Sequence, residues 1–160
     1  GMVFTCDIIP QRPNQGSKIE MQEGCPVVEM RRDNVNTVTQ KNGVCEQRRR
    51  PRYITVRVVV SNAAERGFIV PKPSAFSFDV IEAGSPNGAT AVPAKYVAAQ
   101  STNNSAVFKI DVAGTIVPAS QADASSWYDI RVREAGGIGA VCAVRFVAKW
   151  RRQTGRRGSK

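Results

Sequence analysis

The chain has 160 residues, of which 23 are Lys or Arg and 13 are Asp or Glu, so its formal net charge is +10. It contains no histidine, which excludes Ser-His-Asp and Cys-His catalysis, histidine-containing zinc sites and imidazole acid–base chemistry. The length fits one domain with its own core, and no apolar run approaches the roughly 18 residues that a transmembrane segment needs.

The first half of the chain contains one clear strand pattern and several weaker ones. Residues 53–60 alternate strictly, with apolar side chains at every even position, which is typical of a strand with one face in a core. Residues 10–24 predict an irregular connection, and Asn42-Gly43 predicts a turn because both residues tolerate positive φ. Weaker strand patterns cover residues 4–9, 26–30, 35–39 and 68–70.

The second half contains four more segments with the same strict alternation. They are residues 76–80, 108–112, 128–132 and 142–150. The glycine-rich stretch from Gly136 to Gly139 lies between the last two and predicts a hairpin loop. Residues 119–126 predict one helical turn, and residues 85–88 predict a tight turn. Weaker strand patterns cover residues 94–98 and 115–117.

Many short strands separated by glycine and proline predict an all-β fold, with residues 1–150 forming a single antiparallel β-sandwich. Helix is expected only as short turns. Alternation does not give strand order, so immunoglobulin-like and jelly-roll topologies both remain open. Residues 151–160 contain no apolar side chain and predict a mobile basic tail.

The four cysteines, Cys6, Cys25, Cys45 and Cys142, are widely spaced and form no CxxC pair. Cys6 and Cys142 lie in strand patterns, where free thiols pack as small hydrophobic side chains. We therefore expect four unpaired thiols, no metal and no cofactor. The opening residues resemble a tag-removal scar before a native methionine, which favours an intracellular location. Removal of a signal peptide would instead mean a secreted or surface protein.

Basic residues concentrate in three places and predict contact with negatively charged partners. Arg131 and Arg133 share the outward face of one predicted strand, and Arg145 and Lys149 share that of the next. A hairpin would align these four cations beside acidic neighbours such as Asp111 and Asp129, which could relieve their repulsion. The other two clusters are Arg151, Arg152, Arg156, Arg157 and Lys160 in the tail, and Arg48, Arg49, Arg50 and Arg52 before strand 53–60. Such runs are also compatible with solvated surfaces that have no dedicated partner.

No motif identifies a reaction. The sequence favours a non-enzymatic binding or structural module that contacts a protein partner or a second copy of itself, and Phe68-Ile69-Val70-Pro71 is a candidate apolar edge for that contact. The first alternative is a polyanion binder that uses the basic residues to contact nucleic acid or anionic lipid. The second is a hydrolase that uses two carboxylates from among Asp79, Asp111 and Asp129.

Overall fold

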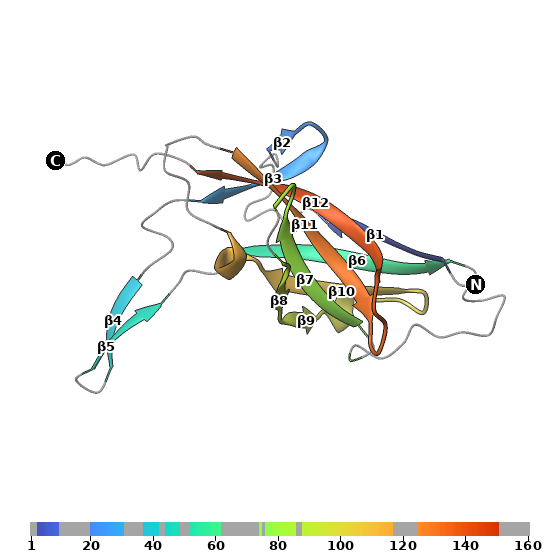
Figure 1. The fold of residues 1–160 in the computed structure, drawn as a ribbon. Helices are drawn as coiled ribbons and strands as arrows, with labels where there is room; N and C mark the ends of the chain where they lie inside the picture. Colours follow the sequence, from blue (N-terminus) through green and yellow to red (C-terminus); the bar gives the residue numbers. More distant parts are fainter. Residues whose placement is uncertain are drawn as a thin grey trace.

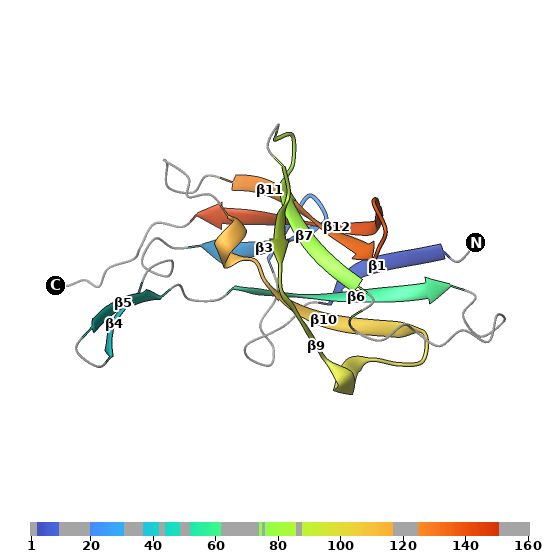
Figure 2. The same ribbon diagram turned by 60° about the horizontal axis from the view of Figure 1, so that its bottom comes forward.

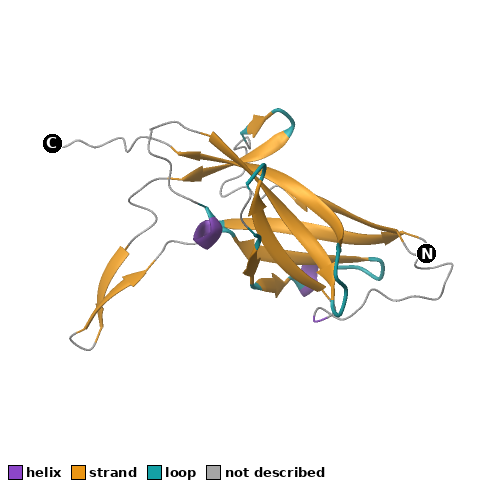
Figure 3. Ribbon diagram, in the orientation of Figure 1, coloured by secondary structure: helices purple, strands orange, loops and turns teal. Residues whose placement is uncertain are grey.

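The computed structural model describes residues 3–9, 20–30, 37–41, 44–48, 52–61, 74, 76–85, 88–116 and 125–150. Within these residues nearly all regular structure is β-strand (Figure 3), which confirms the predicted all-β class. Helix is limited to short 3₁₀ turns such as Ala98–Gln100 and Ala113–Thr115. In this part of the chain no helix is both long and apolar enough to cross a membrane.

The strands form two larger sheets and a separate hairpin. The four-stranded sheet has the order β1 (Val3–Ile9), β6 (Tyr53–Ser61), β10 (Ser105–Asp111), β9 (Ala94–Tyr96). The six-stranded sheet has the order β2 (Met21–Gln22), β3 (Cys25–Met30), β12 (Ala140–Trp150), β11 (Ser125–Glu134), β7 (Phe76–Glu82), β8 (Thr90–Val92). The remaining hairpin, β4 (Thr37–Lys41) with β5 (Val44–Arg48), stands apart from both sheets (Figures 1 and 2).

The core lies between the two larger sheets, which form two layers in Figure 2. The apolar positions of the five alternating segments point into it, because successive side chains of a strand face opposite sides. Val56 and Val58 of β6 are fully buried, as are Ile130 and Val132 of β11. Aromatic rings from both sheets meet there, with the ring centroids of Phe78 and Phe108 4.9 Å apart. The strict alternation in the sequence therefore identified the core faces.

One strand pair departs from the antiparallel arrangement that the sequence predicted. Strand β3 runs parallel to β12, with Val27 opposite Val147, whereas the other described pairs are antiparallel. A tight hairpin forces its two strands to run antiparallel, but β3 and β12 are separated by most of the chain. No turn therefore fixes their relative direction, and alternation alone gave no signal for it.

A disulfide between Cys6 of β1 and Cys142 of β12 joins the two sheets, with the two Cα atoms 6.0 Å apart. The prediction of four unpaired thiols is therefore wrong for this pair, whereas Cys25 is free. The pattern placed both side chains on inward faces, but it did not show that β1 and β12 lie opposite each other.

Several local predictions differ from the structure or fall outside it. Strand β2 interrupts the irregular connection predicted for residues 10–24, and Thr115 belongs to a 3₁₀ turn instead of a strand. Ser125 and Ser126 begin β11 instead of ending a helical turn. No pattern in the sequence indicated the short strands β5 and β8. The predicted turn at 42–43, apolar edge at 68–71 and tail at 151–160 lie outside the described residues.

Candidate functional site

The outward face of the six-stranded sheet carries one of the three groups of basic side chains that the sequence singled out. Arg131 and Arg133 of β11 alternate with buried residues, and Arg145 and Lys149 of β12 do the same. Strands β11 and β12 pair along their length, and Asp129 lies directly opposite Arg145. The fold therefore brings these four cations onto one face, together with acidic residues of neighbouring strands.

Asp79 of β7 lies between two of these arginines. The Nε atoms of Arg131 and Arg133 each donate a hydrogen bond to one of its carboxylate oxygens, both at 2.7 Å. Arg133 also donates to the carbonyl oxygen of Ile138 in the β11–β12 turn. Burial on its own raises the pKa of Asp79, but the hydrogen bonds and charges of the two arginines outweigh it and hold that pKa below its usual range. Asp79 therefore stays ionised and couples β7 to β11.

The other two cations of this face also have acidic partners. Arg145 donates two hydrogen bonds to Asp129, at 2.8 and 3.0 Å, and this carboxylate raises the pKa of the guanidinium. Lys149 lies 3.9 Å from a carboxylate oxygen of Glu20. Exposed ion pairs of this kind contribute at most about 1 kcal/mol each to stability. These ion pairs have a larger effect on the surface potential, because the carboxylates neutralise the cations. A polyanion would have to compete with these carboxylates for the same cations.

In the basic clusters at residues 48–52 and 151–160, Arg52 is the one residue whose side chain is described. Its backbone N–H donates to the Asp111 carboxylate at 3.0 Å, and its Nε donates to the carbonyl oxygen of Glu29 at 3.1 Å. Asp111 also accepts a hydrogen bond from the Ala113 N–H, so it closes the turn after β10 instead of facing the outward cations. For Arg48 only the backbone of β5 is described, and Arg49, Arg50 and the tail residues lie outside the described part.

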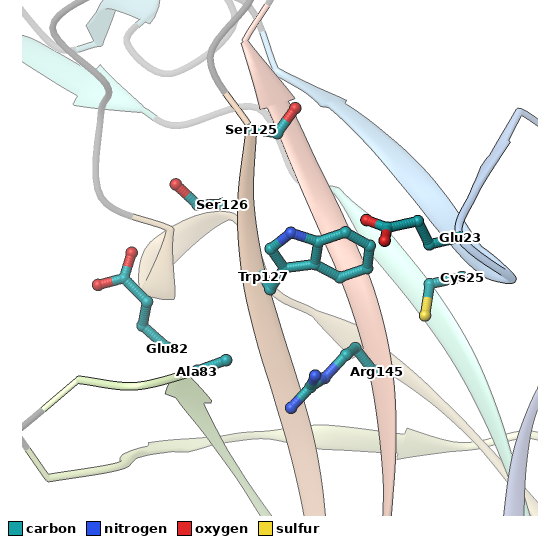
Figure 4. A pocket seen from close by; sticks show the side chains of 8 residues that line it. All are labelled: Glu23, Cys25, Glu82, Ala83, Ser125, Ser126, Trp127 and Arg145. Carbon is teal, nitrogen blue, oxygen red and sulfur yellow. The ribbon is translucent and has the colours of Figure 1, made fainter.

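A recess of about 650 Å³ opens on the same outward face, where β11 begins. Its lining comes from the β2–β3 turn, β3, the end of β7, the start of β11 and β12. Figure 4 shows the indole of Trp127 in the middle, with Glu23 and Cys25 on one side and Glu82 on the other. The complete lining is Glu23, Cys25, Glu82, Ala83, Ser125, Ser126, Trp127 and Arg145.

Trp127 is held in place by the sheet around it. It continues the outward-facing series of β11, and its carbonyl oxygen accepts a hydrogen bond from the Ala83 N–H at 2.8 Å. Its partner in register is Val147, which in turn pairs with Val27 of β3. Val147 is fully buried although it belongs to the outward-facing set of β12. The half-buried indole of Trp127 therefore lies on this charged face at a position paired with a fully buried residue.

The charge of the recess is negative. Arg145 is paired with Asp129, whereas the side chains of Glu23 and Glu82 have no hydrogen bond or ion pair within the described residues. Glu23 has a φ of 50° and Gly24 a φ of 81° in the two-residue turn between β2 and β3, as a type I′ hairpin turn requires. Glycine and asparagine are favoured at such positions, so a glutamate there is unusual. This turn places Glu23 at the rim of the recess.

The recess contains one thiol, two hydroxyls and two carboxylates, from Cys25, Ser125, Ser126, Glu23 and Glu82. Cys25 and the two serines are potential nucleophiles, but no histidine exists in the chain to activate them. Asp79, Asp111 and Asp129, the carboxylates considered for a hydrolase, are each engaged by arginine side chains or backbone N–H groups. In the part of the chain that the structure describes, no three potential ligands come together to hold a metal.

Comparisons with family models, curated proteins and solved structures gave no match to this chain. The site must therefore be interpreted from its own residues. The sequence analysis missed Trp127, Glu23 and Glu82. Trp127 carried a usable signal, because it directly precedes the alternating segment 128–132 and falls on its polar side. The two glutamates carried none, since they meet Trp127 only through the order of the strands.

Proposed function

We propose that this chain is a non-enzymatic binding module that docks a protein partner on the outward face of its six-stranded sheet, with the recess around Trp127 at the centre. The observation that carries this proposal is a half-buried tryptophan on a well-paired strand, next to Arg145 and facing a recess. Tryptophan and arginine are among the residues that contribute most to protein–protein interfaces. Their strands hold them in a fixed geometry, which lowers the entropy lost on binding.

The chemistry of the recess favours a cationic side chain of the partner. An ammonium or guanidinium group is attracted to the face of an indole ring, and nearby carboxylates strengthen that attraction. Glu23 and Glu82 supply two carboxylates without ion pairs in the described residues, on a chain whose net charge is +10. The neighbouring hydroxyls of Ser125 and Ser126 add hydrogen-bonding groups. An exposed lysine or arginine of a partner protein matches this set.

The backbone of Glu23 supports a binding role for the recess. A residue other than glycine at positive φ is held in a sparsely populated conformation, and such positions cluster at functional sites. Asparagine or glycine would suit the turn better. We infer that the glutamate is present for its carboxylate.

For the fold, we propose an immunoglobulin-like sandwich in preference to a jelly roll. The orders β1-β6-β10-β9 and β12-β11-β7-β8 fit the A-B-E-D and G-F-C-C′ sheets of immunoglobulin domains, in the same chain order. Such domains bind through loops and sheet faces. The Cys6–Cys142 bridge further supports an oxidising compartment as the place where the module works.

The polyanion alternative has less support on this face, because each of the four outward cations has an acidic partner. Among the basic residues that the sequence singled out, it would depend on those that lie outside the described part.

A direct test measures the affinity of the protein for a fluorescein-labelled hexa-arginine peptide. The double variant Glu23→Gln/Glu82→Gln should bind about two- to thirtyfold more weakly, since exposed ion pairs contribute about 0.2–1 kcal/mol each. Trp127→Ala should lose about thirtyfold or more, whereas Trp127→Phe should keep most of the affinity. Glu134→Gln is the matched control, because it removes the same charge at the other end of β11. Equal weakening by Glu134→Gln, or no effect of Trp127→Ala, would contradict the proposal.

A further inference from the structure

Two lysines lie directly opposite each other on the four-stranded sheet, on the side of the molecule away from the recess. Lys95 of β9 pairs in register with Lys109 of β10, and both side chains are exposed. The next residues on the two strands, Tyr96 and Phe108, are also paired and pack together, with ring centroids 5.7 Å apart. Phe108 belongs to the core, so the two lysines point outward from the same sheet.

These two charges are not compensated within the described residues. Neither lysine has a carboxylate within ion-pair distance, whereas Arg57 on the same face pairs with Asp7 at 2.6 Å. The nearby Asp111 carboxylate accepts hydrogen bonds from the backbone N–H groups of Arg52 and Ala113. Like charges directly opposite each other destabilise a sheet. A negatively charged ligand would relieve that repulsion.

An aromatic side chain completes the surface. The Nζ atom of Lys109 lies 4.3 Å from the ring centroid of Tyr53, and Tyr53 is 49 % exposed. Tyr53 is also on the outward face of β6, two residues from Thr55, which is opposite Lys109, and it lies directly opposite Asp111. Lys95, Lys109 and Tyr53 therefore form a strip across β9, β10 and β6, which we name the lysine–tyrosine strip.

We propose that the lysine–tyrosine strip binds single-stranded nucleic acid, with Lys95 and Lys109 contacting phosphates and a base lying against Tyr53. Cationic groups that follow the backbone and aromatic rings that receive bases are the two elements of single-strand binding on β-sheet surfaces. A duplex keeps its base faces stacked inside, and a lipid headgroup has no flat ring to place on a tyrosine. The strip lies on the opposite sheet from the recess, so this inference is independent of the proposed function.

The test uses the full chain and a fluorescently labelled oligothymidylate of about 12 nucleotides, titrated at low and moderate salt. Lys95→Gln and Lys109→Gln should each weaken binding. Each should also make the slope of log K against log salt shallower by about 0.7, the value expected per phosphate contact on a single strand. Lys149→Gln is the matched control, because it removes one lysine charge from the other sheet, where Glu20 pairs with it. Its slope should equal that of the unmodified protein.

Variants of Tyr53 distinguish binding of nucleic acid from binding of an anionic membrane. Tyr53→Phe should retain affinity, and Tyr53→Leu should lose about fivefold or more, because base stacking requires a ring. Thermal unfolding should show that Lys95→Gln is at least as stable as the unmodified chain, since it removes a like-charge repulsion. The proposal is overturned if Lys149→Gln weakens binding as much as Lys95→Gln, or if the full chain shows no salt-sensitive binding of the oligonucleotide. It is also overturned if the protein binds phosphatidylserine vesicles more tightly than the oligonucleotide and Tyr53→Leu changes neither affinity.

Discussion

Removal of the Cys6–Cys142 disulfide should destabilise the protein by about 2–5 kcal/mol. The bond joins residues that are 136 positions apart, so it closes nearly the whole chain into a loop. The chain-entropy relation for a loop of that size gives about 5 kcal/mol near room temperature. A typical domain has a free energy of unfolding of about 5–15 kcal/mol, so this loss would be a large fraction of the total.

The assay is guanidinium unfolding without reductant, followed by tryptophan fluorescence. It compares the unmodified protein, the double variant Cys6→Ala/Cys142→Ala and the control Cys25→Ala, which alters a free thiol. The double variant should also show a larger m value, because its unfolded chain is no longer cross-linked and exposes more surface. With reductant present, the unmodified protein should approach the double variant. The reasoning would be refuted if the double variant, measured without reductant, stayed within about 0.5 kcal/mol of the unmodified protein.

Three further changes test the sheet, the charges and the turns. Asp79→Asn should lower stability by about 1.5–3 kcal/mol, because both hydrogen bonds come from charged arginines, whereas Asp129→Asn at an exposed pair should lower it less. Folding lowers the pKa of Asp79, so the stability that this carboxylate contributes is present above its pKa in the unfolded chain and is lost as the pH falls through its pKa in the folded chain. The free energy of unfolding should therefore depend less on pH in the acid range for Asp79→Asn than for the unmodified protein. Gly136→Ala, at a φ of 82°, should destabilise by about 1–2 kcal/mol in urea unfolding, and Gly139→Ala, whose φ lies outside the left-handed region, by less. Glu23→Asn should raise the free energy of unfolding by up to about 1 kcal/mol while weakening binding of the hexa-arginine peptide. A variant that is less stable and binds the peptide as tightly as the unmodified protein would argue against a functional role of this glutamate.

The sequence predicted the features that depend on neighbouring residues of one strand. Strict alternation gave β6, β7, β10, β11 and β12 and the faces that they bury, because period-two burial is a local property of a strand. It also gave the outward positions of Arg131 and Arg145. Val147 shows the limit of this logic, since it belongs to an outward series and is nevertheless fully buried beside Trp127.

The features that depend on strand order could not be predicted. Glu23 and Glu82 are far apart in the chain and line one recess only because β3, β12, β11 and β7 are neighbours in that order. The disulfide and the parallel pairing of β3 with β12 have the same origin. The predicted cationic face likewise did not include Asp79. This carboxylate lies beside Arg131 only because β7 pairs with β11.

The most direct test of the binding proposal is an NMR titration of the ¹⁵N-labelled protein with unlabelled hexa-arginine peptide. The chain has two indole N–H groups, at Trp127 in the recess and at Trp150 in the core. We expect the Trp127 indole resonance and the backbone resonances of Glu23 and Ser126 to shift in a saturable way, while the Trp150 indole resonance stays in place. Saturable shifts confined to other surfaces, or no shift of the Trp127 resonance at saturating peptide, would contradict it.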